Sequence, residues 1–369
     1  DQRRHRPAPS TFLGKGKLEE LKERIEENEA TLVIFDNDLS PAQGRNLEKA
    51  LDVNELDRTE LIHDIYANHA STRQTRLQDE LALLQYLLPR LTRLWSHLER
   101  QAGGIGTRGP GETQLETDRR LLNRRIAVLN RSLKEIETNR QTQVRSRENV
   151  FRAGLVGYTN AGKSTLMNGV TGAGVYVKDQ LFATLDATTR RVETDERRRF
   201  LLTDTVGFIR RLPHHLVESF KATLQEVREA DLMVHVVDAS SDDPDHQIAS
   251  VNRVLAEIVP EEKPTLMVFN KMDLVDRDLF VNRYRRAYPE AVFVSAKRPE
   301  GWSELRDAIL SRLVADETVV TVRLPITNLH GLSSFHRTGS VLDQRVDADQ
   351  CIATLRVKPE ELNGLLTRE

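Results

Sequence analysis

The fold of this chain is decided by the stretch Gly157-Tyr158-Thr159-Asn160-Ala161-Gly162-Lys163-Ser164. The stretch has the G-x-x-x-x-G-K-[ST] spacing of a phosphate-binding loop, follows the mainly apolar run 151–156, and opens through Thr165 into a helical pattern. Backbone N–H groups at the start of that helix would point at phosphates, Lys163 would neutralise β/γ charge, and Ser164 would offer its hydroxyl to Mg²⁺. The stretch therefore predicts an α/β phosphate-loop domain with a mixed, mostly parallel sheet and flanking helices.

Three further motifs follow the loop in the order expected of a GTPase. Asp204-Thr205-Val206-Gly207 comes after an apolar run, which places Asp204 to hold Mg²⁺ through a water and the Gly207 N–H to meet the γ-phosphate. Asn270-Lys271-Met272-Asp273 and Ser295-Ala296-Lys297 each follow another such run. The Asp273 carboxylate is expected to accept two hydrogen bonds from guanine, and the 295–297 segment to bring a backbone N–H to the guanine oxygen. Because a buried carboxylate left unpaired is costly, this set predicts GTP rather than ATP as the bound nucleotide.

The segment Phe182-Ala183-Thr184-Leu185-Asp186 lies between the phosphate loop and Asp204. Thr184 is the natural switch threonine for Mg²⁺ and the γ-phosphate, so Lys163, Thr184 and Gly207 are the candidate catalytic residues. The residue after Gly207 is Phe208, where many GTPases carry the glutamine that orients the attacking water. A phenyl ring cannot hydrogen-bond water, so hydrolysis is predicted to be slow in the protein alone and to depend on a partner.

Asn160 leaves two interpretations open. Several related GTPases use an asparagine at this position to bind a potassium ion beside the β- and γ-phosphates, where the ion could replace the charge of an arginine finger. Alternatively, Asn160 simply hydrogen-bonds its own loop.

Length and composition narrow the class of protein. A chain of 369 residues should hold two or three domains, each with its own core. With 38% hydrophobic, 5% aromatic and 30% charged residues, the composition indicates a soluble, helix-rich cytoplasmic protein. No apolar run is long enough to span a membrane, and the protein is expected to be a monomer. The lone Cys351 excludes a disulfide framework and predicts no metal cluster. Because the chain begins with Asp1 rather than Met, further residues are expected upstream.

Charge is distributed unevenly along the chain. Residues 72–147 hold 15 Lys and Arg against 8 Asp and Glu, a net +7, which leaves −9 for the rest of a chain whose net charge is −2. A basic module on an acidic protein favours contact with nucleic acid, although a solvated helix face rich in arginine remains the alternative.

Residues 1–70 are predicted to form a small α/β subdomain. Residues 31–35 are expected to form a short buried strand, and Ser40-Pro41 to start a helix with a cap and a proline at its first position. Residues 61–66 are interpreted as a second strand or a strand–helix junction. His63 and His69 are interpreted as structural residues rather than metal ligands.

Residues 71–148 are predicted to form an antiparallel helical hairpin. Apolar residues recur at steps of four and three in a first series, Leu77, Leu81, Leu84, Leu88, Leu91, Trp95 and Leu98. A second series is Leu115, Leu122, Ile126, Leu129, Leu133 and Ile136. Two helices of about 30 residues each, joined by a short connection, fit this pattern. Pro89 is expected to kink the first helix.

The tip of the hairpin, residues 102–112, is rich in glycine. Residues 104–109 match the dinucleotide fingerprint G-x-G-x-x-G, but that motif must follow a strand and here it follows a helix, so the match is rejected. A stable hairpin needs only a few loop residues, so a longer glycine-rich loop favours close approach to another molecule over a merely flexible turn. The candidate contact residues are Gly103, Gly104, Gly106, Arg108, Gly109 and Gly111.

The GTPase domain is predicted to span residues 149–315, and residues 316–369 to form a small α+β domain. Strands are expected at residues 318–322, 341–346 and 351–357, with a helix near Leu329.

With these pieces in place, the chain resembles the HflX family of ribosome-associated GTPases over nearly its whole length. The resemblance is carried by Gly14-Lys15-Gly16-Lys17, by Leu39-Ser40-Pro41-Ala42-Gln43-Gly44-Arg45-Asn46-Leu47, by Asp57-Arg58-Thr59, and above all by residues 103–120, GGIGTRGPGETQLETDRR. It implies binding to the large ribosomal subunit and its ribosomal RNA, with the hairpin loop directed toward the peptidyl-transferase region. It also implies the splitting of stalled ribosomes under stress. The arginines after the tip, Arg119, Arg120, Arg124 and Arg125, are the further candidate RNA contacts.

Two other functions remain open on the sequence. One is a GTP-regulated RNA-binding or ribosome-assembly factor that does not split ribosomes. The other is a regulatory adaptor whose hairpin docks a protein.

Overall fold

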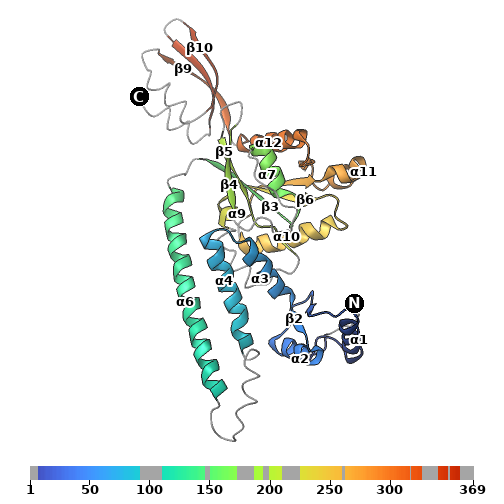
Figure 1. Ribbon diagram of the computed structural model, residues 1–369. Helices are drawn as coiled ribbons and strands as arrows, with labels where there is room; N and C mark the ends of the chain where they lie inside the picture. The colour runs from blue at the N-terminus through green and yellow to red at the C-terminus, as the bar shows by residue number, and fades with distance from the viewer. Residues whose placement is uncertain are drawn as a thin grey trace. The chain divides into compact units, whose positions relative to one another are not determined.

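The computed structural model describes residues 7–91, 110–145, 150–172, 187–193, 199–209, 225–259, 262–315, 317–325, 340–347 and 350–357 (Figure 1). Two compact units divide these residues, one up to Arg145 and the other from Val150 onward. The finer boundaries at residues 70, 148 and 315 stay predictions. Three predicted features lie outside the described residues: tip residues 102–109, switch segment 182–186, and the helix near Leu329. None of the described helices combines the length and the apolar character that a membrane span needs.

The first unit begins with a small α/β layer. Helix α1 (Lys15–Glu27), strand β1 (Leu32–Ile34), helix α2 (Pro41–Leu51) and strand β2 (Asn54–Leu56) follow one another, and the two strands pair in parallel. Ser40 caps α2 as predicted, in a reciprocal capping box with Gln43 and with Pro41 at the first helical position. The prediction of a buried strand is right for one face only, since Leu32 and Ile34 on the other face are 44% and 53% exposed.

Helix α3 (Arg58–His69) covers all of residues 61–66, so both the strand and the strand–helix junction predicted there are wrong. The helix starts where Asp57 accepts a hydrogen bond from the Glu60 N–H. Ile62, His63 and Tyr66 are buried on one side of the helix. Their helical spacing is hard to recognise in so short an apolar run, which can be taken for a strand. The second strand is β2, which precedes this cap.

The hairpin consists of α4 (Arg73–Leu87), which gives way to a 3₁₀ turn η1 (Leu88–Arg90) at Pro89, and of α6 (Pro110–Arg145) (Figure 1). The change of helix type at Pro89 fits the loss of its N–H. Helices α4 and α6 pack together, with Leu81 and Leu129 buried. A second buried stripe on α4 is polar, comprising Thr75, Gln78 and Asp79, and the leucine series did not reveal it. His63 of α3 bonds Asp79 of this stripe at 3.2 Å, as its structural interpretation requires.

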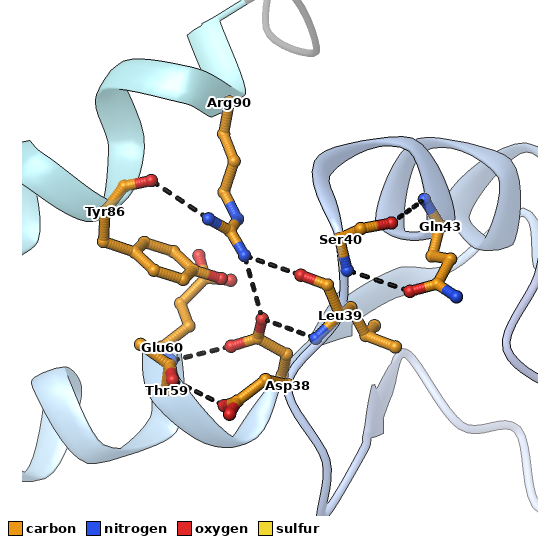
Figure 2. Close-up of polar contacts among 9 residues, drawn as sticks. Asp38, Leu39, Ser40, Gln43, Thr59, Glu60, Tyr86 and Arg90 are labelled. Carbon is orange, nitrogen blue, oxygen red and sulfur yellow. Dashed lines mark hydrogen bonds and ion pairs between the residues drawn. The ribbon is translucent and has the colours of Figure 1, made fainter. Parts of the chain in front are cut away.

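Arg90, in the 3₁₀ turn, joins the hairpin to the α/β layer (Figure 2). Its Nη2 donates to Leu39 O at 2.7 Å and lies 3.4 Å from Asp57 Oδ2, and its guanidinium lies 3.6 Å from the centroid of the Tyr86 ring. The buried Asp57 also accepts hydrogen bonds from the Leu39 and Glu60 N–H groups. One carboxylate therefore caps α3, holds the segment after β1, and receives the arginine of the hairpin.

The second unit contains a six-stranded sheet in the order β4-β5-β3-β6-β7-β8. Strand β4 (Thr188–Glu193) is antiparallel to β5 (Arg199–Asp204), while all the other neighbours are parallel. The other four strands are β3 (Phe151–Gly157), β6 (Leu232–Asp238), β7 (Thr265–Asn270) and β8 (Val292–Phe293). This is the predicted mixed, mostly parallel sheet.

Helices cover both faces of this sheet. The core on one face joins Leu155 and Val234 to Leu166 of α7 (Lys163–Thr171) and Leu305 of α12 (Pro299–Leu313). The core on the other face surrounds Phe269, and helices α10 (Pro244–Ile258) and α11 (Arg277–Arg285) contribute to it. A short helix α9 (Gln225–Glu229) packs near β3, and the 3₁₀ turn η2 (Met272–Leu274) follows β7. The inner strands β3, β6 and β7 are covered on both faces, so most of their residues are apolar without alternation, whereas the edge strand β4 is largely exposed.

A second sheet of three antiparallel strands ends the described chain, in the order β10-β11-β9. Its strands are β9 (Thr318–Pro325), β10 (Ser340–Asp347) and β11 (Gln350–Val357). All three predicted strands are confirmed. Every second residue of β11, Cys351, Ala353, Leu355 and Val357, is buried.

Candidate functional site

The phosphate loop joins the end of β3 to the start of α7, which is the context that its sequence predicts. Gly162 has φ +89°, and a Cβ there would lie 2.2 Å from Asn270 Nδ2. Both the left-handed backbone and the contact demand glycine at this position. Asn160 has φ +59° and is exposed, a conformation that asparagine tolerates better than most residues.

Lys163 is buried beneath this loop and bonded to it. Its Nζ donates to Gly157 O at 3.2 Å and to Tyr158 O at 2.9 Å. Burial lowers the pKa of Lys163 to about 8, against the opposing influence of the Asp204 charge. A Cβ on Gly207 would lie 3.1 Å from Lys163 Nζ, so the Gly207 backbone and the lysine amine are neighbours. The two are thus placed to meet the same phosphate group.

Ser164 and Asp204 converge at the start of α7, where Mg²⁺ is expected. Ser164 Oγ donates to Asp204 Oδ2 at 2.5 Å, and Asp204 is buried. A hydroxyl beside a carboxylate supplies the hard oxygen ligands that Mg²⁺ prefers, so these residues fit the ion. The described residues contain no group of three or more His, Cys, Asp or Glu that could hold a metal ion without a nucleotide.

Phe208 occupies the position where many GTPases carry a water-orienting side chain. Its side chain is only 2% exposed, its N–H donates to Gly157 O at 3.0 Å, and its carbonyl accepts from Thr159 N–H at 2.8 Å. The segment after Gly207 is therefore bonded to the phosphate loop through its backbone. The buried ring cannot orient water, in agreement with the prediction from sequence.

The two base-recognition motifs are bonded to each other and to the phosphate loop. Asn270, 1% exposed, donates from Nδ2 to Ala161 O at 2.8 Å and accepts from Ala296 N–H at 2.8 Å. Met272 N–H donates to Val294 O at 3.1 Å. Asn270 thus fixes the 295–297 loop at a set distance from the phosphates.

Asp273 is exposed, whereas the argument from sequence takes its carboxylate to be buried. Its Oδ1 accepts a hydrogen bond from Ser295 Oγ at 2.6 Å, which is the main cause of the lowered pKa of this carboxyl. The carboxylate is therefore ionised and held in place. The side chain of Lys271 lies 2.7 Å from Asp238 Oδ2 and keeps the backbone of the motif in position.

Two side chains near the site, the half-buried Trp302 and the buried His235, had no signal in the sequence patterns. Trp302 of α12 donates from its indole Nε1 to Ala296 O at 2.7 Å. His235 of β6 is 1% exposed, and burial, followed by the charge of Lys163, lowers its pKa to about 4. His235 is therefore neutral at physiological pH. Only the contacts of these residues, and not their spacing, identify them.

The candidate RNA contacts on α6 divide into two groups. Arg119, Arg120 and Arg124 are exposed. Arg125 instead forms a two-pronged ion pair with Glu80 of α4, at 2.7 Å and 2.8 Å. Its guanidinium is thus shared with the partner helix of the hairpin. Gly111 lies in the first turn of α6, and the remaining tip residues lie outside the described part of the chain.

Sequence models of three protein families match consecutive parts of the chain. Residues 1–67 match the family described as GTP-binding GTPase N-terminal, and residues 69–147 match the GTP-binding GTPase middle region. Residues 152–271 match the family described as 50S ribosome-binding GTPase.

Curated relatives of the chain share its sequence over most of their length. GTPase HflX of Flavobacterium psychrophilum is 48% identical over 329 residues, which cover 84% of this chain and 79% of the relative. GTPase HflX of Escherichia coli is 46% identical over 353 residues, which cover 95% of this chain and 83% of the relative.

Among solved structures, the chain is similar to a GTP-binding protein from Sulfolobus solfataricus in complex with GDP. The two share 26% identity with a TM-score of 0.47, covering 84% of this chain and 88% of the other. Because identities above 40% extend over most of the relatives above, the family is established by sequence. The chain belongs to the HflX family of ribosome-associated GTPases, and the reaction at its phosphate-loop site is the hydrolysis of GTP.

Proposed function

We propose that this protein is a GTP-dependent translation factor that binds the large ribosomal subunit and splits or recycles stalled ribosomes under stress. The observation that carries the proposal is a row of three exposed residues on α6, Arg120, Arg124 and Arg131. At about 100° per residue they lie within about 40° of one another, on the side of the helix opposite Leu122 of the apolar seam. We call these three residues the arginine row.

The arginine row fits an RNA backbone. Guanidinium groups bind phosphates through paired hydrogen bonds, and neutralised phosphates release counterions. A row along one rigid helix can follow successive phosphates, whereas Arg125 is already paired with Glu80. The match of residues 152–271 to the family described as 50S ribosome-binding GTPase supports ribosomal RNA as that partner.

The hairpin tip is proposed to reach the peptidyl-transferase region. Helix α6 contains 36 residues, about 54 Å at 1.5 Å per residue, and starts directly after the glycine-rich segment. A stalk of that length can carry residues 102–112 deep into a larger assembly. The glycines would then allow the backbone to lie close against RNA.

Mg²⁺ and nucleotide are proposed to complete the switch. Ser164 would bind the ion directly, Asp204 through a water, and Thr184 would add its hydroxyl when GTP is present. Held by these residues, Mg²⁺ would supply positive charge beside the phosphates. Lys163 would add a second positive charge. The Gly207 N–H would donate a hydrogen bond to the γ-phosphate, so the segment that contains Phe208 would respond to the presence of that phosphate. The 295–297 loop would present a backbone N–H to the guanine oxygen.

Hydrolysis is proposed to be slow in the free protein and to be stimulated by the ribosome. The phenyl ring of Phe208 is buried, so the chain offers no side chain at that position to orient the attacking water. The large subunit would complete this geometry, and hydrolysis would then permit release. We propose the cytoplasm as the site of action and a monomer as the acting species.

The alternative is a GTP-regulated RNA-binding or ribosome-assembly factor without splitting activity. It shares the arginine row and the GTPase site, so the two proposals differ only in the fate of joined ribosomes.

Binding of the protein to isolated large subunits tests the role of the arginine row. Replacing Arg120 and Arg124 by Gln, singly and together, is expected to weaken binding with a GTP analogue and to reduce the slope of log affinity against log salt by about one for each phosphate that is no longer neutralised. Arg125→Gln is the matched control for each of the two single variants, because it removes one positive charge from a residue already paired within the hairpin. Equal losses of affinity in the control and test variants would contradict the assignment, as would unchanged binding in both.

A further inference from the structure

Gly169 lies in the last turn of α7. Glycine is needed there because a side chain would have no room, and not because the backbone is unusual. Its backbone is helical, which any residue could adopt. A Cβ at this position, however, would lie 2.3 Å from Nε1 and 2.4 Å from Cδ1 of Trp302. The indole of α12 therefore rests on the bare backbone of the helix that starts at the phosphate loop.

The same indole is bonded to the base-recognition loop. Its N–H donates to Ala296 O at 2.7 Å, while Ala296 N–H donates to Asn270 Oδ1 at 2.8 Å. The first turn of α12 also touches this loop, since a Cβ on Gly301 would lie 2.7 Å from Ser295 O. The 295–297 loop is thus held from one side by Asn270 and from the other by Trp302.

We propose that Trp302 is a positioning residue for the guanine base. Seated on Gly169, it sets the distance between the 295–297 loop and the helix whose first turn receives the phosphates. The inference rests on the proposed contact between this loop and the guanine oxygen. Changing Trp302 should therefore weaken only those ligands that bind through the guanine oxygen, because only their affinity depends on the position of the 295–297 loop.

The hydrogen bond defines the expected size of the effect. One neutral hydrogen bond to the loop corresponds to roughly a three- to tenfold change in affinity. Trp302→Phe keeps a ring against Gly169 and removes only the donor. We expect GDP to bind roughly three- to tenfold more weakly to this variant, through faster dissociation.

A second probe separates positioning from general stability. The diphosphate of 2-aminopurine riboside lacks both the 6-oxygen and the N1–H of guanine, so it cannot use the proposed loop contact and keeps only the 2-amino group for Asp273. Its affinity should be the same for wild-type protein and Trp302→Phe. Trp95→Phe serves as the matched control for loss of an indole elsewhere, and GDP should bind it as it binds wild type.

Gly169 supplies an independent variant. Gly169→Ala places a methyl group where the indole lies, so it should weaken GDP binding in the same selective way. In a Trp302→Ala background the added methyl group meets no ring, so Gly169→Ala should cause no further loss of GDP affinity. Such non-additive losses show that two residues are coupled.

The experiment is the equilibrium binding and dissociation of both diphosphates with full-length protein, alongside thermal unfolding. Selective weakening of GDP in Trp302→Phe supports the proposal. Equal weakening of both ligands, or no weakening of GDP, would overturn it and leave Trp302 a structural residue only. If wild-type protein does not prefer GDP over the analogue, the proposed guanine contact fails, and with it this inference.

Discussion

The charge of Lys163 depends on what surrounds it, which makes nucleotide binding sensitive to pH. Burial lowers its pKa to about 8 from 10.5. Between these values the unfolded chain binds more protons than the folded one, so the free energy of unfolding rises with pH across this window. Nucleotide binding changes in the opposite direction, because phosphates favour the ammonium form. We expect GDP affinity to fall as the pH rises above about 8, with uptake of a proton on binding.

Calorimetric titration of GDP in two buffers of different ionisation enthalpy, from about pH 7 to about pH 9.5, measures both effects. The low pKa of His235, about 4, keeps that imidazole neutral throughout, so it does not obscure the result. A flat affinity without proton uptake would show that Lys163 is fully charged before the nucleotide arrives.

Asp273 tests the choice of nucleotide. Asp273→Asn replaces an acceptor by an amide that faces the guanine N1–H, so GTP affinity should fall on the order of a hundredfold or more. Xanthosine nucleotides, whose edge is complementary to the amide, should gain affinity in part. Ser295→Ala is the control, because it removes the hydroxyl bonded to Asp273 but leaves the carboxylate. Unchanged GTP binding in Asp273→Asn would rule out this residue as the base-reading group.

Asn160 tests whether a potassium ion takes part in catalysis. If its side-chain oxygen binds the ion, hydrolysis should be several-fold faster in potassium than in sodium at equal ionic strength, and the difference should vanish without that oxygen. Because Asn160 has φ +59°, Asn160→Gly is a better variant than Asn160→Ala: glycine keeps the backbone unstrained. Equal rates in the two salts, with and without ribosomes, would favour the simpler interpretation, in which Asn160 only stabilises its loop.

At the scale of elements, the contact between Arg90 and Asp57 holds the hairpin to the α/β layer (Figure 2). Arg90→Ala leaves the buried carboxylate without its cation and Leu39 O without its donor. We expect the free energy of opening of this layer to fall by about 2–4 kcal/mol, with GDP binding unchanged.

Hydrogen exchange of peptides that span β2 and α3 measures this opening directly. Arg73→Ala removes an exposed arginine from α4, the helix that precedes this turn, and should leave the exchange rates as they are. If Arg90→Ala exchanges no faster than this control, the contact contributes nothing to the stability of the layer.

Elements with a strong chemical signal could be predicted from sequence. The phosphate loop, the proposed magnesium ligands Ser164 and Asp204, and the two proposed base-recognition motifs lie at the ends of neighbouring strands, as their order along the chain predicts. Their spacing is dictated by the nucleotide, which leaves few arrangements possible. The periodic leucines also predicted the packing of the two hairpin helices, and Leu81 and Leu129 are buried as expected.

Contacts that depend on tertiary packing could not be predicted. Residues 61–66 form a helix because Asp57 caps it, and the cap matters only once Leu39 and Arg90 surround that carboxylate. Trp302 could be found only when α7 and α12 were seen together, since neither residue of the Gly169–Trp302 pair belongs to a motif. The ion pair of Arg125 with Glu80 likewise spans 45 positions of sequence.

At the scale of the whole molecule, nucleotide and RNA are proposed to bind different units. The GTPase site lies in the second unit, and the arginine row and the start of the tip lie in the first. Deleting residues 103–111 and closing the hairpin with a short turn should therefore leave GTP binding intact while ribosome binding falls. The same deletion serves as the control for the measurement that follows.

Sedimentation of intact ribosomes through a density gradient, after incubation with the protein and a non-hydrolysable GTP analogue, tests the central claim most directly. The account predicts that joined ribosomes fall into subunits, with the protein on the large subunit. With GDP, or with the tip-deleted protein, the ribosomes should stay joined. Ribosomes that remain joined at saturating protein and GTP analogue, with the protein bound to them, would contradict the splitting function and favour the RNA-binding alternative.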